Sequence, residues 1–338
     1  MTYESPAKVK VKGIGQVAIV VNDLQKTAEN YWNILGIGPW DIYAWEAPLV
    51  YDRKYHGKPA WAREKIAVAQ VGGVELELCQ SVAGNSIYQD FLTEHGEGLH
   101  HLFFLIDDAD ETAEILAKQG FPSLQSGRFG PLDHSATYYN IDIKPLHAIW
   151  EPIHKEVVGE VAGAKPIRYP SAPQESPAKV KVKSIFRVGI VVKDVQQTAE
   201  NYWNILGIGP WDIYLWEVPL VYDRKYHGEP AWAREKIAVA QVGKVELELC
   251  QYIDGDSIYR DYLTEHGEGL HHLSFLVDDV DETVEILAKQ GFRSEQSGRF
   301  GPPEHKGAYH YINIRPLGIV WEPIHYGKSM GVEPSRYP

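Results

Sequence analysis

The sequence predicts an α+β protein built from four βαβββ modules, two in each half of the chain. The first reason is an internal repeat: "TAENYWNILGIGPWDIY" starts at Thr27 and again at Thr198, and "ESPAKVKVK" starts at Glu4 and again at Glu175. The second reason is that one order of strand-like and helix-like segments occurs twice within each repeat. Each repeat is as long as an ordinary domain, so we expect two domains rather than a solenoid.

The first module begins with an apolar strand-like segment at 16–21. A segment with helical spacing of its apolar residues follows at 24–36 and ends in glycine. Three more strands, separated by a long loop and a Gly–Gly turn, are predicted at 39–45, 64–71 and 74–80. The loop at 46–64 is aromatic and cationic, and loops of this length are often lids or binding loops.

The second module repeats this order. A strand at 100–106 precedes a helix at 108–120 that has acidic residues in its first turn. Three strands follow, at 123–129, 137–143 and 147–153. The whole pattern then recurs 171 positions later. We therefore expect domains at 1–154 and 175–338, joined by an exposed linker at 155–174 that is rich in Gly, Ala and Pro.

Composition limits the class of partner. The formal net charge of −13 argues against nucleic acid and against an anionic membrane surface. Each repeat carries a single cysteine, so neither repeat can contain an internal disulfide, and a reducing cytoplasm is the simplest location. No apolar run approaches the ~20 residues that span a bilayer. We expect a cytoplasmic monomer or homodimer that binds a small molecule.

Four polar side chains lie on the first and last strands of the two modules: Gln16, Glu77, His101 and Glu151. Taken alone, each of these residues is more simply explained as a surface or structural residue than as a metal ligand. If the modules pair as symmetric halves, however, the four converge into an oxygen-rich site that suits a divalent metal. Strand alternation places His100 and His101 on opposite faces, so His101 is the predicted ligand and His100 a structural or supporting residue.

Several motifs together resemble the vicinal oxygen chelate superfamily: "VAIVVNDLQKTAENYWNILGIGPW", "VELELCQ", "GEGLHHLFFLIDDADETAEILAKQG" and "HAIWEPI". This group includes glyoxalase I, methylmalonyl-CoA epimerase, extradiol dioxygenases and antibiotic-resistance proteins. The sequence is most similar to the methylmalonyl-CoA epimerase-like members. The resemblance implies that paired modules curl into two cup-shaped half-barrel domains, each able to hold a metal in its cup.

The resemblance also implies which positions hold the metal. In the first copy they are Gln16, Glu77, His101 and Glu151, and in the second they are Glu248, His272 and Glu322 with Arg187 in the remaining position. Arginine has no acceptor and cannot bind a metal. Arg187 could instead neutralise the two carboxylates or bind a substrate carboxylate. We therefore expect a divalent metal (Mn, Co, Ni, Zn, Fe or Mg) more in the first copy than in the second.

Differences between the copies suggest substrate-binding positions. Substitutions gather on faces that a cup would present to its ligand, and the predicted contacts are Phe103, Tyr139 and His147 in the first copy and Arg187, Ser274 and His310 in the second. Arg53 and His56, in the long loop, are further candidates for contact with an anionic or aromatic substrate.

By resemblance, a metal in such a cup polarises a substrate carbonyl while Glu151 or Glu77 moves a proton to or from carbon. The predicted reaction is epimerisation or isomerisation α to a carbonyl of an acyl-CoA or small oxo acid. A glyoxalase-like lyase is the alternative enzyme. A non-catalytic protein that sequesters an aromatic ligand is the alternative from another class. One histidine and two carboxylates fit a ring-cleaving dioxygenase less well.

Overall fold

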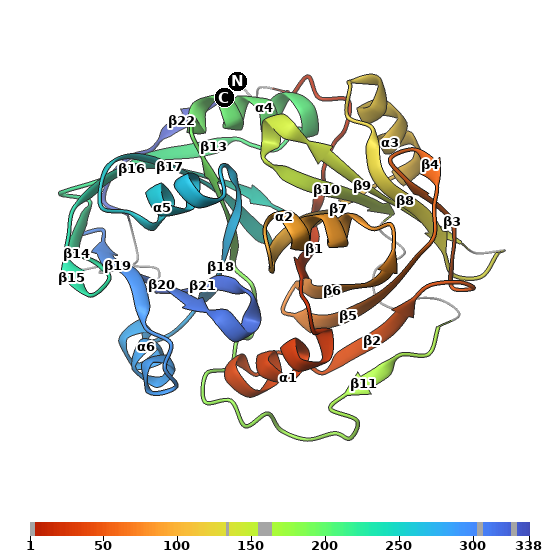
Figure 1. The fold of residues 1–338 in the computed structure, drawn as a ribbon. Coiled ribbons are helices and arrows are strands. Elements are labelled where there is room, and N and C mark those ends of the chain that lie inside the picture. Colours follow the sequence, from red (N-terminus) through yellow and green to blue (C-terminus); the bar gives the residue numbers. More distant parts are fainter. Residues whose placement is uncertain (1–3, 133–134, 155–163, 303–306, 326–329) are drawn as a thin grey trace. The chain divides into compact units, whose positions relative to one another are not determined.

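The computed structural model describes residues 4–132, 135–154, 164–302, 307–325 and 330–338. The chain divides into two compact units, and each contains one curled sheet of 11 strands (Figure 1). The N-terminal unit comprises Lys8–Ala178 together with Pro316–Gly318. The C-terminal unit comprises Lys179–Arg315 and Ile319–Pro338 together with residues 4–7.

The N-terminal unit contains both of its predicted modules. Its first module and the helix after it comprise β1 (Gly13–Val20), α1 (Leu24–Leu35), β2 (Trp40–Trp45), β3 (Val50–Tyr55), β4 (Lys58–Pro59), β5 (Ala62–Val71), β6 (Val74–Gly84) and α2 (Ile87–Glu94). Its second module comprises β7 (Gly98–Ile106), α3 (Ala109–Lys118), β8 (Ser123–Phe129), β9 (Ala136–Ile143), a 3-10 turn η1 (Lys144–Leu146) and β10 (Ala148–His154), and β11 (Ile167–Tyr169) follows.

Strand order in this unit explains why polar residues converge. The sheet runs β11-β2-β5-β6-β1-β7-β10-β9-β8-β3-β4. β1 is antiparallel to β7 at the centre, while β6 is parallel to β1 and β10 is parallel to β7. The first and last strands of both modules are therefore the four central strands of the sheet. The predicted fold class, paired βαβββ modules in a curled sheet, is confirmed.

The C-terminal unit repeats this arrangement. It consists of β12 (Arg187–Val192), α4 (Val195–Leu206), β13 (Trp211–Trp216), β14 (Val221–Tyr226), β15 (Glu229–Pro230), β16 (Ala233–Val242), β17 (Val245–Gly255), α5 (Ile258–Glu265), β18 (Gly269–Leu276), α6 (Val280–Lys289), β19 (Ser294–Phe300), β20 (Gly307–Ile314), β21 (Ile319–His325) and β22 (Ser335–Tyr337). A 3-10 turn, η4 (Arg315–Leu317), precedes β21. The four central strands are β17, β12, β18 and β21.

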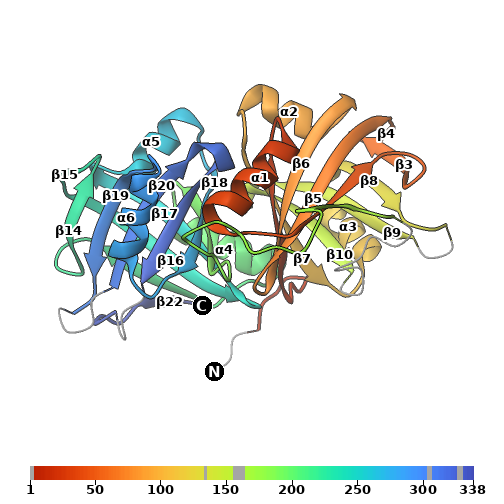
Figure 2. The same ribbon diagram turned by 90° about the horizontal axis from the view of Figure 1, so that it is seen from below.

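Local signals fix the helices. The Asp23 carboxylate accepts a hydrogen bond from the Lys26 N–H at the start of α1, and Gly36 ends that helix in the left-handed region at φ 67°. Asp108 caps α3 in the same way. α1 packs on β5 and β6 and α3 packs on β9 and β10, while α2 lies against β1 and β6 (Figures 1 and 2).

The predicted loop at 46–64 is mostly strand. β3 pairs with β8 of the other module, and β3 and β4 form a short hairpin. Both residues of its turn, His56 (φ 47°) and Gly57 (φ 74°), are left-handed, which matches the twist of a tight hairpin. The expectation of a long lid or binding loop is wrong, because this segment is held in the sheet.

The predicted linker also contains a strand. Residues 155–163 lie outside the described residues, but β11 pairs with the edge strand β2. Arg168 on β11 donates two hydrogen bonds to the Asp41 carboxylate at 2.8 and 2.7 Å. This part of the connector is thereby tied to the sheet of the N-terminal unit.

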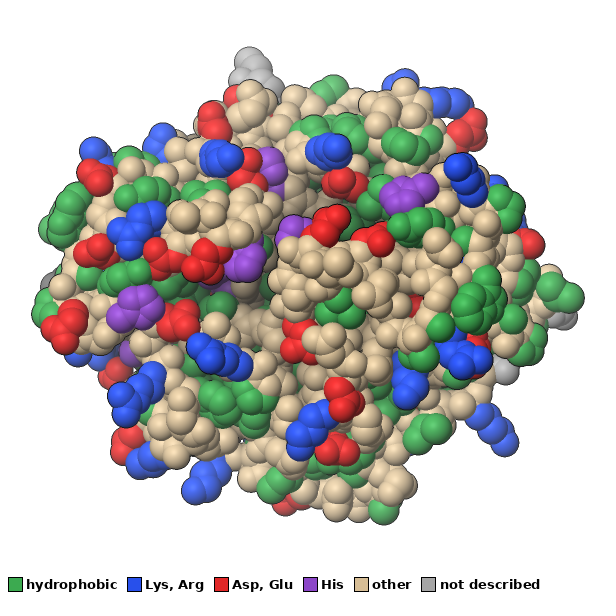
Figure 3. All heavy atoms as spheres, in the orientation of Figure 1, with side chains coloured by type: hydrophobic (Ala, Val, Ile, Leu, Met, Phe, Trp, Pro, Cys, Tyr) green, Lys and Arg blue, Asp and Glu red, His purple; other side chains and the backbone are tan. Residues whose placement is uncertain are grey.

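On the face shown in Figure 3, cationic and anionic side chains are interspersed. None of the helices that the structure describes is long and apolar enough to cross a membrane.

Candidate functional site

The central strands of the N-terminal unit bring four predicted residues onto one face of the sheet. Ala18 on β1 pairs with Glu77 on one side and with His101 on the other, and Phe103 pairs with both Gln16 and Glu151. His101 is fully buried, and its Nε2 atom lies 3.1 Å from Glu151 Oε2 and 3.3 Å from Glu77 Oε2. We call this group, His101 with Glu77, Glu151 and Gln16, the first cup.

The two adjacent histidines do not alternate across the strand. The register between β1 and β7 shifts between Ala18–His101 and Ile19–Leu99, so His100 is the extra residue of a β-bulge. Its Nδ1 lies 2.9 Å from Nδ1 of His101, and both rings are buried. The prediction that His100 points away from the site is wrong, because the bulge turns its ring toward His101.

This contact orients the ring of His101. Burial, and next the neighbouring His101, lower the pKa of His100 well below 6.5, so His100 is neutral. Its Nδ1 can accept a hydrogen bond from Nδ1–H of His101, which leaves Nε2 of His101 directed at the carboxylates. In metal sites, the ring nitrogen of a ligand histidine that does not bind the metal commonly donates a hydrogen bond to a neighbouring group, which fixes the ring.

The first cup brings carboxyl groups together in a buried place. Glu75 shares the strand face of Glu77, and burial, followed by repulsion from Glu77, raises its pKa to about 7. Burial likewise raises the pKa of Glu151. Burial alone would lower the pKa of His101, but contact with Glu151 and Glu77 outweighs burial and raises it to about 9. No Lys or Arg forms an ion pair with these carboxylates among the described residues.

The donor set fits a divalent cation. Two ligand atoms ~2.1 Å from a shared ion lie about 3.0–3.4 Å apart, and the His101–carboxylate distances fall in that range. Although it is buried, Nε2 of His101 has no hydrogen bond of good geometry among the described residues. No three His, Cys, Asp or Glu side chains in the described part are already arranged as a complete metal-binding group. A cation would therefore require the carboxylates to turn toward it.

Two residues that sequence reasoning missed support the first cup. Tyr88 on α2 lies with its ring nearly parallel to His101, the centroids being 6.1 Å apart. The Cys79 thiol donates a hydrogen bond to Glu77 Oε2 at 3.2 Å. Ser86 before α2 is a helix-capping signal that could have predicted the helix and so placed Tyr88.

In the C-terminal unit Arg187 occupies the position of Gln16. Its Nη1 donates to Glu248 Oε1 at 2.6 Å, and its Nη2 donates to Glu246 Oε2 at 2.7 Å. Burial alone would raise the pKa of Glu248, but Arg187 outweighs burial and lowers it to about 2. The guanidinium thus places, inside this second cup, a permanent positive charge where the first cup has the neutral amide of Gln16.

Other substitutions reshape the second cup. A Cβ atom on Gly189 would lie 2.0 Å from Cε1 of His272, so the imidazole occupies space that a methyl group fills at Ala18. Nε2 of His272 lies 3.2 Å from Glu248 Oε2 but 3.7 Å from Glu322 Oε2. The Ser274 hydroxyl donates a short hydrogen bond to Glu322. The two carboxylates of this cup are thus engaged by protein groups.

The second cup opens into a pocket of about 400 Å³, a volume that includes space open to solvent. Its walls combine acidic, cationic and aromatic groups, among them Arg187, Glu248, Glu322, Trp216, Tyr309 and Tyr311. Opposite the carboxylates, the lining is therefore mainly aromatic.

The remaining predicted contacts lie apart from the two charge clusters. The Tyr139 hydroxyl donates to Asp110 on α3 at 2.7 Å, and His310 lies near Asp281 on α6, the equivalent helix of the other unit. His147 adopts a left-handed conformation (φ 54°) before β10 begins, so it does not follow the alternation of that strand. His56 is exposed in the β3–β4 turn and contacts the Tyr55 ring.

Arg53 is buried in β3 rather than exposed on a loop. Its Nη2 lies 2.8 Å from Glu64 Oε2, and the same carboxylate accepts a short hydrogen bond from the Ser86 hydroxyl at the start of α2. The equivalent pair in the C-terminal unit joins Arg224 Nη2 to Glu235 Oε1 at 2.6 Å. Arg53 therefore pairs with Glu64, and Glu64 in turn bonds to Ser86 at the start of α2, the helix that carries Tyr88.

Replacing Arg53 with methionine should lower the free energy of unfolding by about 3–5 kcal/mol, because it leaves Glu64 as a buried uncompensated charge. The control is Arg63→Met, which removes an exposed ion pair to Glu46 and should cost less than about 1 kcal/mol. Urea unfolding followed by circular dichroism measures both. Equal effects would contradict the burial argument.

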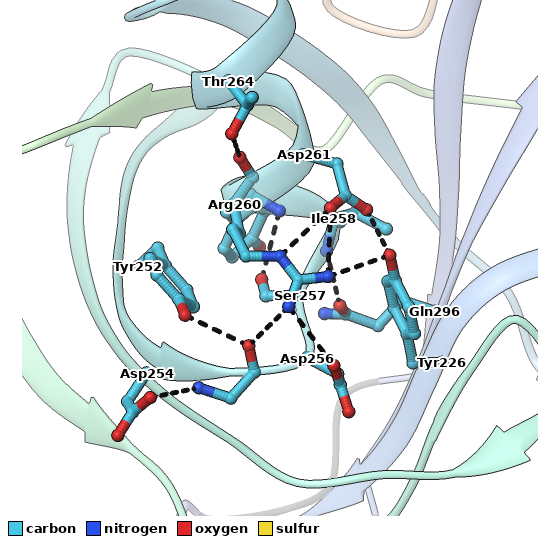
Figure 4. Close-up of polar contacts among 12 residues, drawn as sticks. Tyr226, Tyr252, Asp254, Asp256, Ser257, Ile258, Arg260, Asp261, Thr264 and Gln296 are labelled. Carbon is cyan, nitrogen blue, oxygen red and sulfur yellow. Dashed lines mark hydrogen bonds and ion pairs between the residues drawn. The ribbon is translucent and has the colours of Figure 1, made fainter.

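α5 of the C-terminal unit has an anchor of its own. Arg260 donates to the Gly255 carbonyl at 3.1 Å, to the Tyr226 hydroxyl at 3.2 Å and to the adjacent Asp261 (Figure 4). The Tyr226 hydroxyl in turn donates to Asp261 at 2.5 Å. The N-terminal unit has the equivalent tyrosine–aspartate bond, Tyr55 to Asp90 at 2.7 Å, but Gln89 stands at the position of Arg260, so the arginine contacts belong to one copy only.

With the cup-shaped sheets and their central charge clusters established, comparison with known proteins identifies the class. A family model of the Glyoxalase/Bleomycin resistance protein/Dioxygenase superfamily matches residues 15–138 and, again, residues 186–309. The chain belongs to this superfamily and contains two copies of its domain.

Known relatives are distant. An uncharacterised protein of Bacillus subtilis (strain 168), YqjC, is 29% identical over 103 residues, which make up 30% of this chain and only 64% of that protein. A mutant 4-hydroxymandelate synthase from Streptomyces coelicolor is similar in structure, with a TM-score of 0.63, 15% identity and coverage of 96% of this chain and 95% of its own. A xylose isomerase-like TIM barrel/4-hydroxyphenylpyruvate dioxygenase fusion protein matches with a TM-score of 0.54 and 11% identity, over 97% of this chain and 51% of that protein. At these identities, the structural matches show a shared fold.

Proposed function

We propose that the chain is a metal-dependent enzyme whose reaction takes place in the first cup. The observation that carries this proposal is the difference in charge between two otherwise repeated sites. Among the described residues, Glu77 and Glu151 meet around His101 without a Lys or Arg, whereas the equivalent Glu248 is paired with Arg187. A divalent cation bound by Glu77, His101 and Glu151, with the Gln16 amide oxygen as a weaker ligand, would balance the first cup.

The proposed reaction is proton transfer at the carbon next to a carbonyl, as in an epimerase or isomerase of an acyl-CoA or small oxo acid. A bound divalent metal supplies Lewis-acid polarisation of the carbonyl oxygen. Glu151 or Glu77 would take the proton, since both are buried at the centre of the cup. Burial raises the pKa of Glu151, which makes its carboxylate a stronger base. His100 would keep His101 in the tautomer that faces them.

Solvent exchange tests this proposal. The protein, loaded with Mn²⁺ or Co²⁺, would be incubated in D₂O with a panel of 2-oxo acids and acyl-CoA thioesters, and deuterium at the α-carbon measured by mass spectrometry. We expect incorporation into at least one compound class, abolished by Glu151→Gln and retained in Glu322→Gln. Incorporation that depends equally on both glutamates would overturn the assignment to the first cup.

Two alternatives use the same geometry. A glyoxalase-like lyase would also need a proton moved next to a carbonyl, and its product, rather than an exchanged substrate, would distinguish it. A non-catalytic binding protein for aromatic ligands is favoured by the aromatic pocket of the second cup, whose carboxylates are already paired. Such a protein would give no exchange with any compound in the panel.

The β-bulge histidine provides a further prediction. His100→Phe should keep the edge-on packing against Tyr88 and Phe91 but remove the acceptor for Nδ1–H of His101. We expect the metal affinity of the first cup to fall by about 10–100-fold, the usual cost of losing a supporting hydrogen bond. Isothermal titration with Co²⁺ measures it. His271→Phe, at the equivalent position, is the control and should leave the affinity unchanged.

A further inference from the structure

Beside the first cup lies a second buried amide side chain, that of Asn140, and it has no hydrogen-bond partner among the described residues. Asn140 on β9 is fully buried, and neither its Oδ1 nor its Nδ2 has a hydrogen-bond partner among the described residues. In the ladder between β9 and β10, Ile141 pairs with Trp150, so Asn140 comes opposite Glu151 and shares its face of the sheet. Buried polar groups are almost always paired, so an unpaired amide at this place suggests a binding role.

The second copy shows what fits at this position. There the residue is Tyr311, whose hydroxyl lies 2.6 Å from the hydroxyl of Tyr259. The Tyr311 ring centroid lies 4.9 Å from that of His272 and 5.6 Å from that of Tyr309. A phenol ring carried by the chain itself is therefore accommodated beside the central histidine of the second cup.

The aromatic walls differ accordingly. In the C-terminal unit Tyr259, Tyr311, Tyr309 and Phe300 belong to one continuous cluster of buried apolar residues. In the N-terminal unit the equivalent buried residues form two clusters, one containing Tyr88 and the other containing Phe129 and Tyr138, and the half-buried Trp45 packs against both. Asn140 takes the place of the ring that joins them.

We propose that the first cup binds a small molecule with a phenol-like ring, placed between the Tyr88 cluster and the Tyr138 cluster as Tyr311 is placed in the second cup. The Asn140 amide would hydrogen-bond a polar substituent of this ligand, since it offers an NH2 group as donor and a carbonyl oxygen as acceptor. This inference rests on the proposed function for the use of the first cup, and it adds the chemical class of the substrate.

The ring is favoured over a purely aliphatic group by the walls on both sides. Tyr88 and Tyr138 are aromatic and buried, and aromatic pairs prefer tilted or offset contacts such as those Tyr311 makes. Among the described residues the Tyr138 hydroxyl makes no hydrogen bond of good geometry, although the Trp45 side chain lies close to it. A ligand with a hydroxylated ring would supply partners for such groups, whereas an alkyl chain would not.

The test uses 4-methylphenol, the side-chain analogue of tyrosine, as the probe for ligand NMR and isothermal titration. The native chain should bind one molecule, and Asn140→Tyr should weaken binding at least tenfold because the new ring fills the site. Tyr311→Asn should create a second site, which shows that the probe enters when the ring is removed. No binding to the native chain, or unchanged binding to Asn140→Tyr, would overturn the inference.

A second variant guards against misfolding. Asn140→Leu keeps the size of the side chain but removes both unpaired atoms, so the melting temperature should rise while probe binding falls at least fivefold. The matched control is Gln125→Leu, because the amide of Gln125 bonds to the Ile87 N–H and to Glu64, and its loss should lower the melting temperature. A lower melting temperature in Asn140→Leu with unchanged probe binding would show that the amide is structural.

Metal content, measured on the same samples, separates this inference from the proposed function. One bound metal without probe binding would reject only the aromatic ligand. Probe binding by a chain that contains no metal would support the proposal of an aromatic ligand and would contradict the proposal of a metal-dependent enzyme.

Discussion

Replacing Arg187 with glutamine, together with Gly189→Ala, should raise the metal content from about one to about two ions per chain. Arg187 holds Glu248 and Glu246 in ion pairs, and no cation can approach those oxygens while the guanidinium is there. The alanine methyl group would displace the His272 ring from its position over Gly189 toward the one that His101 has beside Ala18. The double variant thus gives the second cup an uncharged amide at position 187 and the alanine of the first copy at position 189.

The measurement is metal analysis by plasma mass spectrometry after incubation with Mn²⁺, Co²⁺ or Zn²⁺ and removal of the free ion. Arg260→Gln is a suitable control, because it removes another arginine of the same unit and introduces the residue that the first copy has there, and its metal content should not change. A double variant that folds normally yet stays at one ion would show that Arg187 is not what excludes a metal.

Replacing His101 with alanine should abolish metal binding, and this is the second large effect. His101 supplies the only nitrogen ligand of the proposed set, and without it two buried carboxylates, Glu77 and Glu151, would be left facing each other. We expect at least a thousandfold loss of Co²⁺ affinity and a lower free energy of unfolding, because buried like charges destabilise the fold.

His272→Ala provides the matched comparison, since that ring occupies the equivalent position of the second cup. It should lower stability but leave the metal content of the chain unchanged. Equal loss of metal from the two variants would mean that both cups bind metal, and it would remove the functional difference assigned to Arg187.

The arrangement of the central strands could be predicted from the sequence. The repeat, the order of elements and the alternation along "VELELCQ" were enough to place Gln16, Glu77, His101 and Glu151 on four strands, and the structure makes these the central strands of one sheet. The carry-over to the second copy was equally direct, because the repeat aligns without gaps and shows the arginine at position 187.

The orientation of His100 could not be predicted, because it depends on a β-bulge. Strict alternation sends neighbouring side chains to opposite faces, but the register shift beside Ala18 inserts one extra residue and brings both imidazoles together. A bulge is set by pairing between strands distant in sequence, so no pattern within "GLHHLFF" indicates it.

Strand pairing also determines which of two neighbouring residues on β9, Tyr139 or Asn140, faces the cup. Tyr139 and Asn140 both differ between the copies, and the sequence-based prediction named Tyr139 as the contact. The ladder with β10 sets Asn140 opposite Glu151, while Tyr139 reaches Asp110 on α3. Similarly, Arg53 reads as an exposed loop residue until β3 is seen to pair with β8, which buries it beside Glu64.

The most direct test of the central claim is the metal content of the native chain and of Glu77→Ala, purified without chelators and measured by plasma mass spectrometry. The account predicts about one divalent ion per native chain and none in the variant. Two ions per native chain, or none even after incubation with Mn²⁺, Co²⁺, Ni²⁺, Zn²⁺, Fe²⁺ and Mg²⁺, would contradict it.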